Sequence, residues 1–121
     1  MMSKRFDPRL FHNIAINLKN NKDIDQEGRY RTSVGRAYYA AFLITRNRLK
    51  LKGKSFDKNK QHKDVREYLK VLNQEYLASQ LKTLFDYRVK ADYKLNERFN
   101  HDLCKKCIII SQEIINSIEN F

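Results

Sequence analysis

The segment from Gly28 to Asn47 contains no proline and is expected to form one long helix. Its small and apolar residues recur at steps of three and four, the spacing that places side chains on one face of a helix. The alanines let a neighbouring helix approach closely, and the aromatic residues beside them supply a large area to bury. We therefore expect this helix at the centre of the protein. The residues of this face are Val34, Ala37, Tyr38, Ala41, Ile44 and Thr45.

The rest of the chain also shows helical patterns. Three glycines and one proline among 121 residues are too few for a protein of many strands and tight turns. Runs of helical periodicity, bounded by polar segments, divide the chain into five parts. They predict an all-α, up-and-down bundle of four to five helices that forms a single domain over residues 1–121. The expected helices cover about residues 8–20, 25–51, 62–72, 74–88 and 96–121.

Two of these helices carry apolar stripes that predict what they pack against. In the first helix, Leu10, Phe11, Ile14 and Leu18 fall on one face, which we expect to be buried. In the last helix, apolar residues at heptad-like spacing are joined by extra isoleucines, more than one face of a bundle needs. This density favours contact with a second copy of the chain, and we therefore expect a homodimer.

The positive charge of the chain is concentrated in its first part. The formal net charge is +11, and residues 1–72 hold 18 lysines and arginines against 7 acidic residues. A basic surface of this kind attracts phosphate backbones through counterion release, without regard to sequence. The densest run gives Arg46, Lys50 and Lys54 as candidate RNA- or nucleotide-binding residues. A solvated, lysine-rich surface that only aids solubility is the alternative.

Membrane and metal chemistry find little support in the sequence. No segment reaches the roughly 18 apolar residues that span a bilayer, so we expect a cytoplasmic protein without a membrane partner. Cys104 and Cys107 stand three apart on a predicted helix, where free thiols are typical of a reducing compartment. His101 repeats this spacing, but steps of three drift around a helix and no fourth ligand follows. We predict no metal site and no cofactor.

Three elements far apart in the chain form a recognisable set: the run GRAYYAAF from Gly35 to Phe42, then His62, then the run RVKADY from Arg88 to Tyr93. Together with the apolar C-terminal helix they resemble the HEPN superfamily of small helical-bundle proteins, over nearly the whole chain. The resemblance implies four or five helices and, often, a homodimer. Many HEPN proteins are metal-independent endoribonucleases that act as toxins or in phage defence. Others bind nucleotides or act as inactive partners, frequently beside a minimal nucleotidyltransferase.

The resemblance also implies which residues would act. In HEPN nucleases an arginine is followed four to six residues later by a histidine near the dimer axis. Here Arg88 is followed by Asp92 and Tyr93, with no histidine at that distance. The candidate catalytic residues are Arg88, Asp92, Tyr93 and His62, with His101 as another proton source, and Arg36 and Tyr39 are added to the candidate binding residues.

Cleavage by such a site would use the 2′-hydroxyl of the RNA as nucleophile and would leave a cyclic phosphate. The protein would supply a proton acceptor, a proton donor and cations for the charge on the phosphorane. Arg36 and Arg88 are candidates for the cations, His62 or His101 for proton transfer, and Tyr93 for positioning the phosphate.

Each candidate also has a purely structural explanation. Arg88 and Asp92 would form a salt bridge if their helix continued through both. Tyr39 would be a core or interface aromatic, Arg36 a partner for a carboxylate of the C-terminal part, and His62 an exposed residue at a helix start. Two function classes follow. One is a protein that binds or cleaves RNA or nucleotides; the other is a non-catalytic HEPN module that binds a nucleotide or a nucleotidyltransferase partner in a toxin–antitoxin pair.

Overall fold

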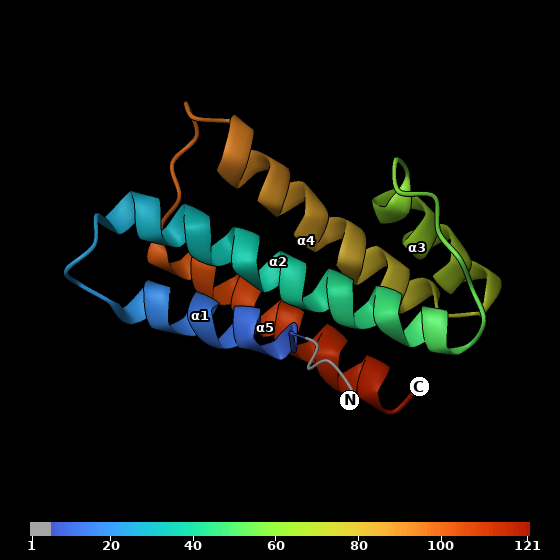
Figure 1. Ribbon diagram of the computed structural model, residues 1–121. Helices are drawn as coiled ribbons and strands as arrows, with labels where there is room; N and C mark the ends of the chain where they lie inside the picture. Colours follow the sequence, from blue (N-terminus) through green and yellow to red (C-terminus); the bar gives the residue numbers. More distant parts are fainter. Residues whose placement is uncertain (1–5) are drawn as a thin grey trace.

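The computed structural model describes residues 6–121, which form five helices and no strand. Four of the helices run alternately up and down, and the third is inserted in the connection between the second and the fourth (Figure 1). The expectation of an all-α, up-and-down bundle is confirmed. The helices are α1 (Arg9–Asn20), α2 (Gln26–Leu51), α3 (Gln61–Val71), α4 (Glu75–Tyr93) and α5 (His101–Glu119).

The long helix α2 is the centre of the bundle, as its sequence predicts. It contacts all four other helices, with α1 and α5 on one side and α4 on the other (Figure 1). Every residue of the face expected from its periodicity is buried. The side chain of Asp25 caps its start by accepting a hydrogen bond from the amide of Gly28 at 2.9 Å. Its end lies just before Gly53, whose φ of 97° is left-handed and therefore favours glycine.

Helix α1 packs with a different face from the one that its apolar stripe predicts. Leu10 and Ile14 are 47% and 43% exposed, whereas His12 and Ala15 are buried. The expectation of a buried stripe is therefore wrong for Leu10 and Ile14. Phe11 packs against the core and Leu18 is partly buried. A polar link decides the rotation of the helix, because Nδ1 of His12 lies 3.2 Å from Oγ of Ser111 on α5. A small residue, Ala15, then faces α2 and permits close approach.

Two helix boundaries near residue 95 differ from the prediction. Helix α4 continues through Tyr93 instead of ending at about Arg88, and α5 begins at His101 instead of near Asn96. The side chain of Asn100 caps α5 by accepting from the amide of Leu103 at 2.8 Å. The extension of α4 matters most, because it places the whole element from Arg88 to Tyr93 on one helix.

Within residues 6–121, every helix is too short or too polar to cross a lipid bilayer. The same part of the chain holds no group of three or more histidine, cysteine, aspartate or glutamate side chains arranged to hold a metal ion. Cys104 and Cys107 are both buried, and burial raises the pKa of the Cys107 thiol to about 12. These thiols are small core residues with little thiolate character.

Candidate functional site

His62 lies where α2, α3 and α4 meet. It begins α3, as expected, but its side chain is half-buried and the expectation of an exposed histidine is wrong. Its ring stacks on Phe42 with centroids 4.3 Å apart and lies 5.4 Å from the ring of Phe85. Its Nδ1 lies 2.5 Å from Oη of Tyr38, which is fully buried. The histidine is thus fixed by aromatic contacts on three sides.

The surroundings of His62 keep its imidazole neutral. Burial lowers its pKa, and the charges of Arg88, Arg66 and Arg46 lower it further. Burial also raises the pKa of Tyr38, so its hydroxyl keeps its proton. Because this hydroxyl has no other acceptor among the described residues, we assign it as the donor to Nδ1, which leaves the imidazole proton on Nε2. In this state His62 is a hydrogen-bond donor, and its basic nitrogen is already occupied.

A second group of side chains lies on the last turns of α4. Nε of Arg88 is 3.0 Å from Oδ2 of Asp92, the ion pair expected from a helix that continues through both residues. This contact falls outside hydrogen-bond geometry, so Nε keeps no hydrogen-bond partner within the described chain. Asp92 lies over Gly35 of α2, where an added Cβ would meet its Oδ1 at 4.0 Å. Tyr93 is 69% exposed, with its ring centroid 5.9 Å from the guanidinium carbon of Arg88.

Tyr39 of α2 lies between two guanidinium groups. The guanidinium carbons of Arg36 and Arg88 are 5.4 and 5.5 Å from its ring centroid, and Nη2 of Arg88 donates to its hydroxyl at 3.3 Å. Arg36 also lies 5.4 Å from the ring of Phe11. No carboxylate of residues 6–121 lies within 4.0 Å of Arg36, so the alternative that gives it a C-terminal carboxylate partner is wrong.

The basic run of the sequence is split in the structure. Arg46 joins the site, because its charge acts on His62 and its Nη1 donates to Oε1 of Gln61 at 3.0 Å. Lys54 packs on Tyr68, with Nζ 5.0 Å from the ring, away from these contacts. Lys50 is exposed at the end of α2, and within residues 6–121 no contact joins it to the site.

Arg66, which was not predicted from the sequence, borders the site. It lies one turn after His62 on α3, and its guanidinium carbon is 5.0 Å from the ring of Phe85. Its Nη1 is buried and has no hydrogen-bond partner within the described chain. The available signal was the spacing of four between His62 and Arg66, which puts both side chains on one face of a helix.

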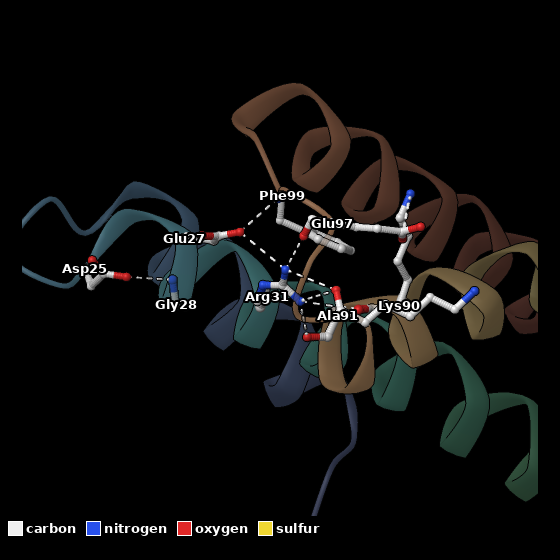
Figure 2. A network of polar contacts seen from close by, with 9 residues as sticks. Asp25, Glu27, Gly28, Arg31, Lys90, Ala91, Glu97 and Phe99 are labelled. Carbon is white, nitrogen blue, oxygen red and sulfur yellow. Dashed lines mark hydrogen bonds and ion pairs between the residues drawn. The ribbon is translucent and has the colours of Figure 1, made fainter.

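Arg31, also missed, fixes the end of α4 (Figure 2). It donates to the carbonyls of Lys90, Ala91, Lys94 and Glu97, the bond to Ala91 being 2.8 Å long. The last carbonyls of a helix have no partner inside the helix, and a positive charge there also suits the helix dipole. Glu27 pairs with the same guanidinium at 3.3 Å. Nothing in the local sequence distinguishes Arg31 from the other arginines of α2.

The assembled surface combines cations, aromatic rings and a neutral histidine. Three arginines, Arg36, Arg46 and Arg88, contribute to it, and Asp92 is the carboxylate paired with one of them. Guanidinium groups bind phosphate oxygens, and aromatic rings stack on bases. The structure therefore brings together Arg36, Tyr39, Arg46, His62, Arg88, Asp92 and Tyr93 of the predicted residues, and leaves Lys50 and Lys54 outside. His101 lies apart from the site, at the start of α5, with Nε2 3.4 Å from Nζ of Lys19.

Comparison with known proteins gives two findings. A model of the HEPN domain family matches residues 15–121, from the second half of α1 to the last residue. An uncharacterized protein of Methanocaldococcus jannaschii is 32% identical over 111 aligned residues, which cover 78% of this chain and 67% of that protein.

Proposed function

This chain belongs to the HEPN domain family, and from that premise we propose that it binds RNA or a nucleotide on the surface formed by α2, α3 and α4. HEPN domains are known from ribonucleases and from nucleotide-related toxin and defence modules. The proposal places the phosphate groups at the arginines and a base at Tyr39 or Tyr93.

The observation that carries the proposal is the pair of arginines around Tyr39. Two guanidinium groups within 5.5 Å of one ring repel each other, and only Arg88 has a carboxylate neighbour. Both guanidinium groups lie over aromatic rings, which hold the charges in place. A bound phosphate relieves this repulsion, and fixed arginines lose little conformational freedom when they bind it.

Binding fits the geometry better than turnover. Cleavage needs a proton acceptor beside the attacking 2′-hydroxyl, and Nδ1 of His62 already accepts from Tyr38. The carboxylate of Asp92 is the other acceptor near Arg88, and it is engaged in the ion pair. A metal-independent endoribonuclease, as a toxin or a defence component, is thus a proposal that requires rearrangement of one of these pairs.

A non-catalytic role as partner of a minimal nucleotidyltransferase is the second candidate. The observation that favours it is Tyr93, an exposed tyrosine five residues after Arg88, where a HEPN nuclease would carry histidine. We also propose a homodimer and a single domain over residues 1–121, for which light scattering at tens of micromolar and limited proteolysis are the direct measurements.

The test of binding compares two variants that lose the same charge. Arg88→Gln removes the arginine shared by Tyr39 and Asp92, and Lys50→Gln removes an exposed cation of α2 outside the site. With a fluorescein-labelled single-stranded RNA, fluorescence anisotropy is expected to show a dissociation constant about tenfold higher for Arg88→Gln and within about twofold for Lys50→Gln. Equal losses in both variants would mean diffuse charge attraction and would contradict a defined site.

Turnover is tested with the same variants. Total RNA and transfer RNA are incubated with the protein in EDTA, after circular dichroism has shown that each variant is folded. Cleavage by the wild type that Arg88→Gln abolishes would establish the endoribonuclease. RNA left intact by a folded wild type that binds it would establish a binding protein.

A further inference from the structure

The three arginines around His62 differ in the partners of their guanidinium groups. Arg88 forms an ion pair with Asp92, and Arg46 donates to neighbouring side-chain amides. Arg66 has neither, and its Nη1 is buried without a partner among residues 6–121. Native proteins rarely leave a buried N–H group without an acceptor. Arg66 is therefore the arginine with the greatest unused capacity for an anion.

Arg66 also lines a groove between α3 and the first part of α4, which lie side by side (Figure 1). The volume of the groove is about 410 Å³. Its walls carry more positive than negative charge. The charged residues are Lys63, Arg66, Lys70 and Lys82 against Glu67 and Glu75.

Two of these lysines are already paired. Nζ of Lys70 is 3.4 Å from Glu67, and Nζ of Lys82 is 2.6 Å from Asp86. Lys63 and Arg66 have no carboxylate within 4.0 Å in the described part of the chain. With these pairs set aside, the positive charge of the groove comes from Lys63 and Arg66, three apart on α3, against the single carboxylate of Glu75.

The groove borders the site already described through Arg66, which lines it. The ring of Phe85 is 5.0 Å from the guanidinium carbon of Arg66 and 5.4 Å from the ring of His62. The guanidinium of Arg66 is planar, and its fork of donors suits two parallel hydrogen bonds to a phosphate. Arg66 lies one turn after His62 on α3, so the groove begins beside the histidine.

We propose that the α3–α4 groove is a second phosphate-binding subsite, in which Arg66 and Lys63 hold a phosphate of the single-stranded RNA bound at Tyr39 and Arg88. The subsite rests on the proposed function for the remainder of the RNA. It makes the preferred ligand an oligonucleotide, because a mononucleotide leaves the groove empty.

The experiment compares Arg66→Gln, Arg88→Gln and the control Lys70→Gln on two ligands, an octanucleotide of uridine and uridine 5′-monophosphate. Lys70 lines the same groove, but its charge is already paired and exposed. Arg66→Gln is expected to weaken octanucleotide binding about tenfold and to leave monophosphate binding within about twofold. Arg88→Gln is expected to weaken both, and Lys70→Gln neither. The loss of one phosphate contact also lowers the slope of log affinity against log salt by about 0.7.

The outcomes separate this proposal from the one it rests on. If Arg66→Gln binds the octanucleotide as tightly as the wild type while Arg88→Gln binds it more weakly, the subsite proposal is overturned. The proposed main site is then still supported. Equal weakening of both ligands by Arg66→Gln places Arg66 in the main site and likewise overturns a separate subsite. Arg66→Lys keeps the charge without the fork of donors. Its affinity for the octanucleotide is expected to lie between those of the wild type and Arg66→Gln.

A second measurement addresses the groove without RNA. Nitrogen-15 and proton NMR spectra of the wild type are recorded while inorganic pyrophosphate is added. Saturable shifts at Lys63, Arg66 and Ser79 that vanish in Arg66→Gln support a phosphate subsite even if no RNA binds. The subsite proposal is overturned if the spectra are unchanged at millimolar pyrophosphate and Arg66→Gln does not weaken octanucleotide binding.

Discussion

The two sides of α2 differ in how completely their buried polar groups are hydrogen-bonded. Toward α1 and α5, the buried polar side chains form closed pairs. Ser111 donates to the carbonyl of Ala37 at 2.7 Å and accepts from His12, and Ser33 donates to the carbonyl of Ala15 at 2.6 Å. Nothing in these pairs is left over for a ligand.

Toward α3 and α4, the polar groups are larger, charged and incompletely paired. Nε of Arg88 and Nη1 of Arg66 are buried without hydrogen-bond partners among the described residues. Aromatic rings hold both guanidinium groups in place. This difference supports the proposal that one side of α2 provides stability and the other binds the ligand, since unsatisfied buried polar groups tend to persist at functional sites.

The largest expected effect is a loss of stability on the side of α2 that faces α1 and α5. Ile114 of α5 is 1% exposed, and Ile114→Ala removes methyl groups from a closely packed core. We expect the free energy of unfolding, measured with urea, to fall by about 3 kcal/mol. Ile109→Ala on the same helix is the control, because Ile109 is 49% exposed and its loss should cost well under 1 kcal/mol.

The next effect concerns Arg31 of α2, which donates to carbonyls at the end of α4 and in the segment after it. Arg31→Gln leaves the carbonyls around Ala91 without their charged donor, and we expect stability to fall by about 2 kcal/mol. Limited proteolysis should then cut more readily between residues 93 and 98. Arg31→Lys keeps the charge but cannot reach several carbonyls at once. Its free energy of unfolding should therefore lie between those of the wild type and Arg31→Gln. An uncut segment in a destabilised Arg31→Gln would contradict the role as a cap.

A dependence on pH distinguishes the buried histidines. Burial lowers the folded-state pKa of both His12 and His62 below the usual 6.5. The unfolded chain therefore binds more protons in this range, and the stability present above about pH 6.5 is lost as the pH falls below it. Each histidine contributes at most about 1.4 kcal/mol per pH unit, with His62 contributing less because it is half-exposed.

Urea midpoints at pH 7.5 and 5.0 measure this loss. The difference between the two midpoints should shrink in His12→Gln, and by a smaller amount in His62→Gln. An equal pH dependence in wild type and both variants would show that other groups cause it.

The smallest effect on stability is expected where the effect on binding is largest. Arg88→Gln removes a partly exposed ion pair together with the repulsion between neighbouring arginines, so we expect stability to change by less than about 1 kcal/mol in either direction. A loss of 3 kcal/mol or more would break the comparison, because it would make Arg88 a structural residue.

Periodicity in the sequence predicted the elements of the bundle that depend on local pattern. The central position of α2 followed from the spacing of small and aromatic residues, and the number of helices from the polar segments between them. The rotation of α1 did not follow, because it depends on a bond between His12 and Ser111, 99 positions apart. The end of α4 was missed for the same reason, since Arg31 reaches it from another helix.

The site shows a similar division. A resemblance to a family gave Arg88, Asp92 and Tyr93, which local spacing alone did not distinguish from a salt bridge on a helix. Charge density along the chain pointed to Lys50 and Lys54, but Lys50 is exposed near the end of α2 and Lys54, which follows the helix, packs on Tyr68. Their part in RNA binding, like that of every candidate residue, stays a prediction until binding is measured.

The insertion of α3 has a consequence for motion. Within residues 6–121, α3 contacts α2 and α4 but neither α1 nor α5, so it can detach while the other four helices stay packed. Its amide protons should then exchange with deuterium through a smaller opening than those of α2. Since His62 and Arg66 belong to α3, each such opening removes them from the surface and returns them to it. The site would open and close at the rate at which α3 detaches and repacks, which is faster than unfolding of the whole protein.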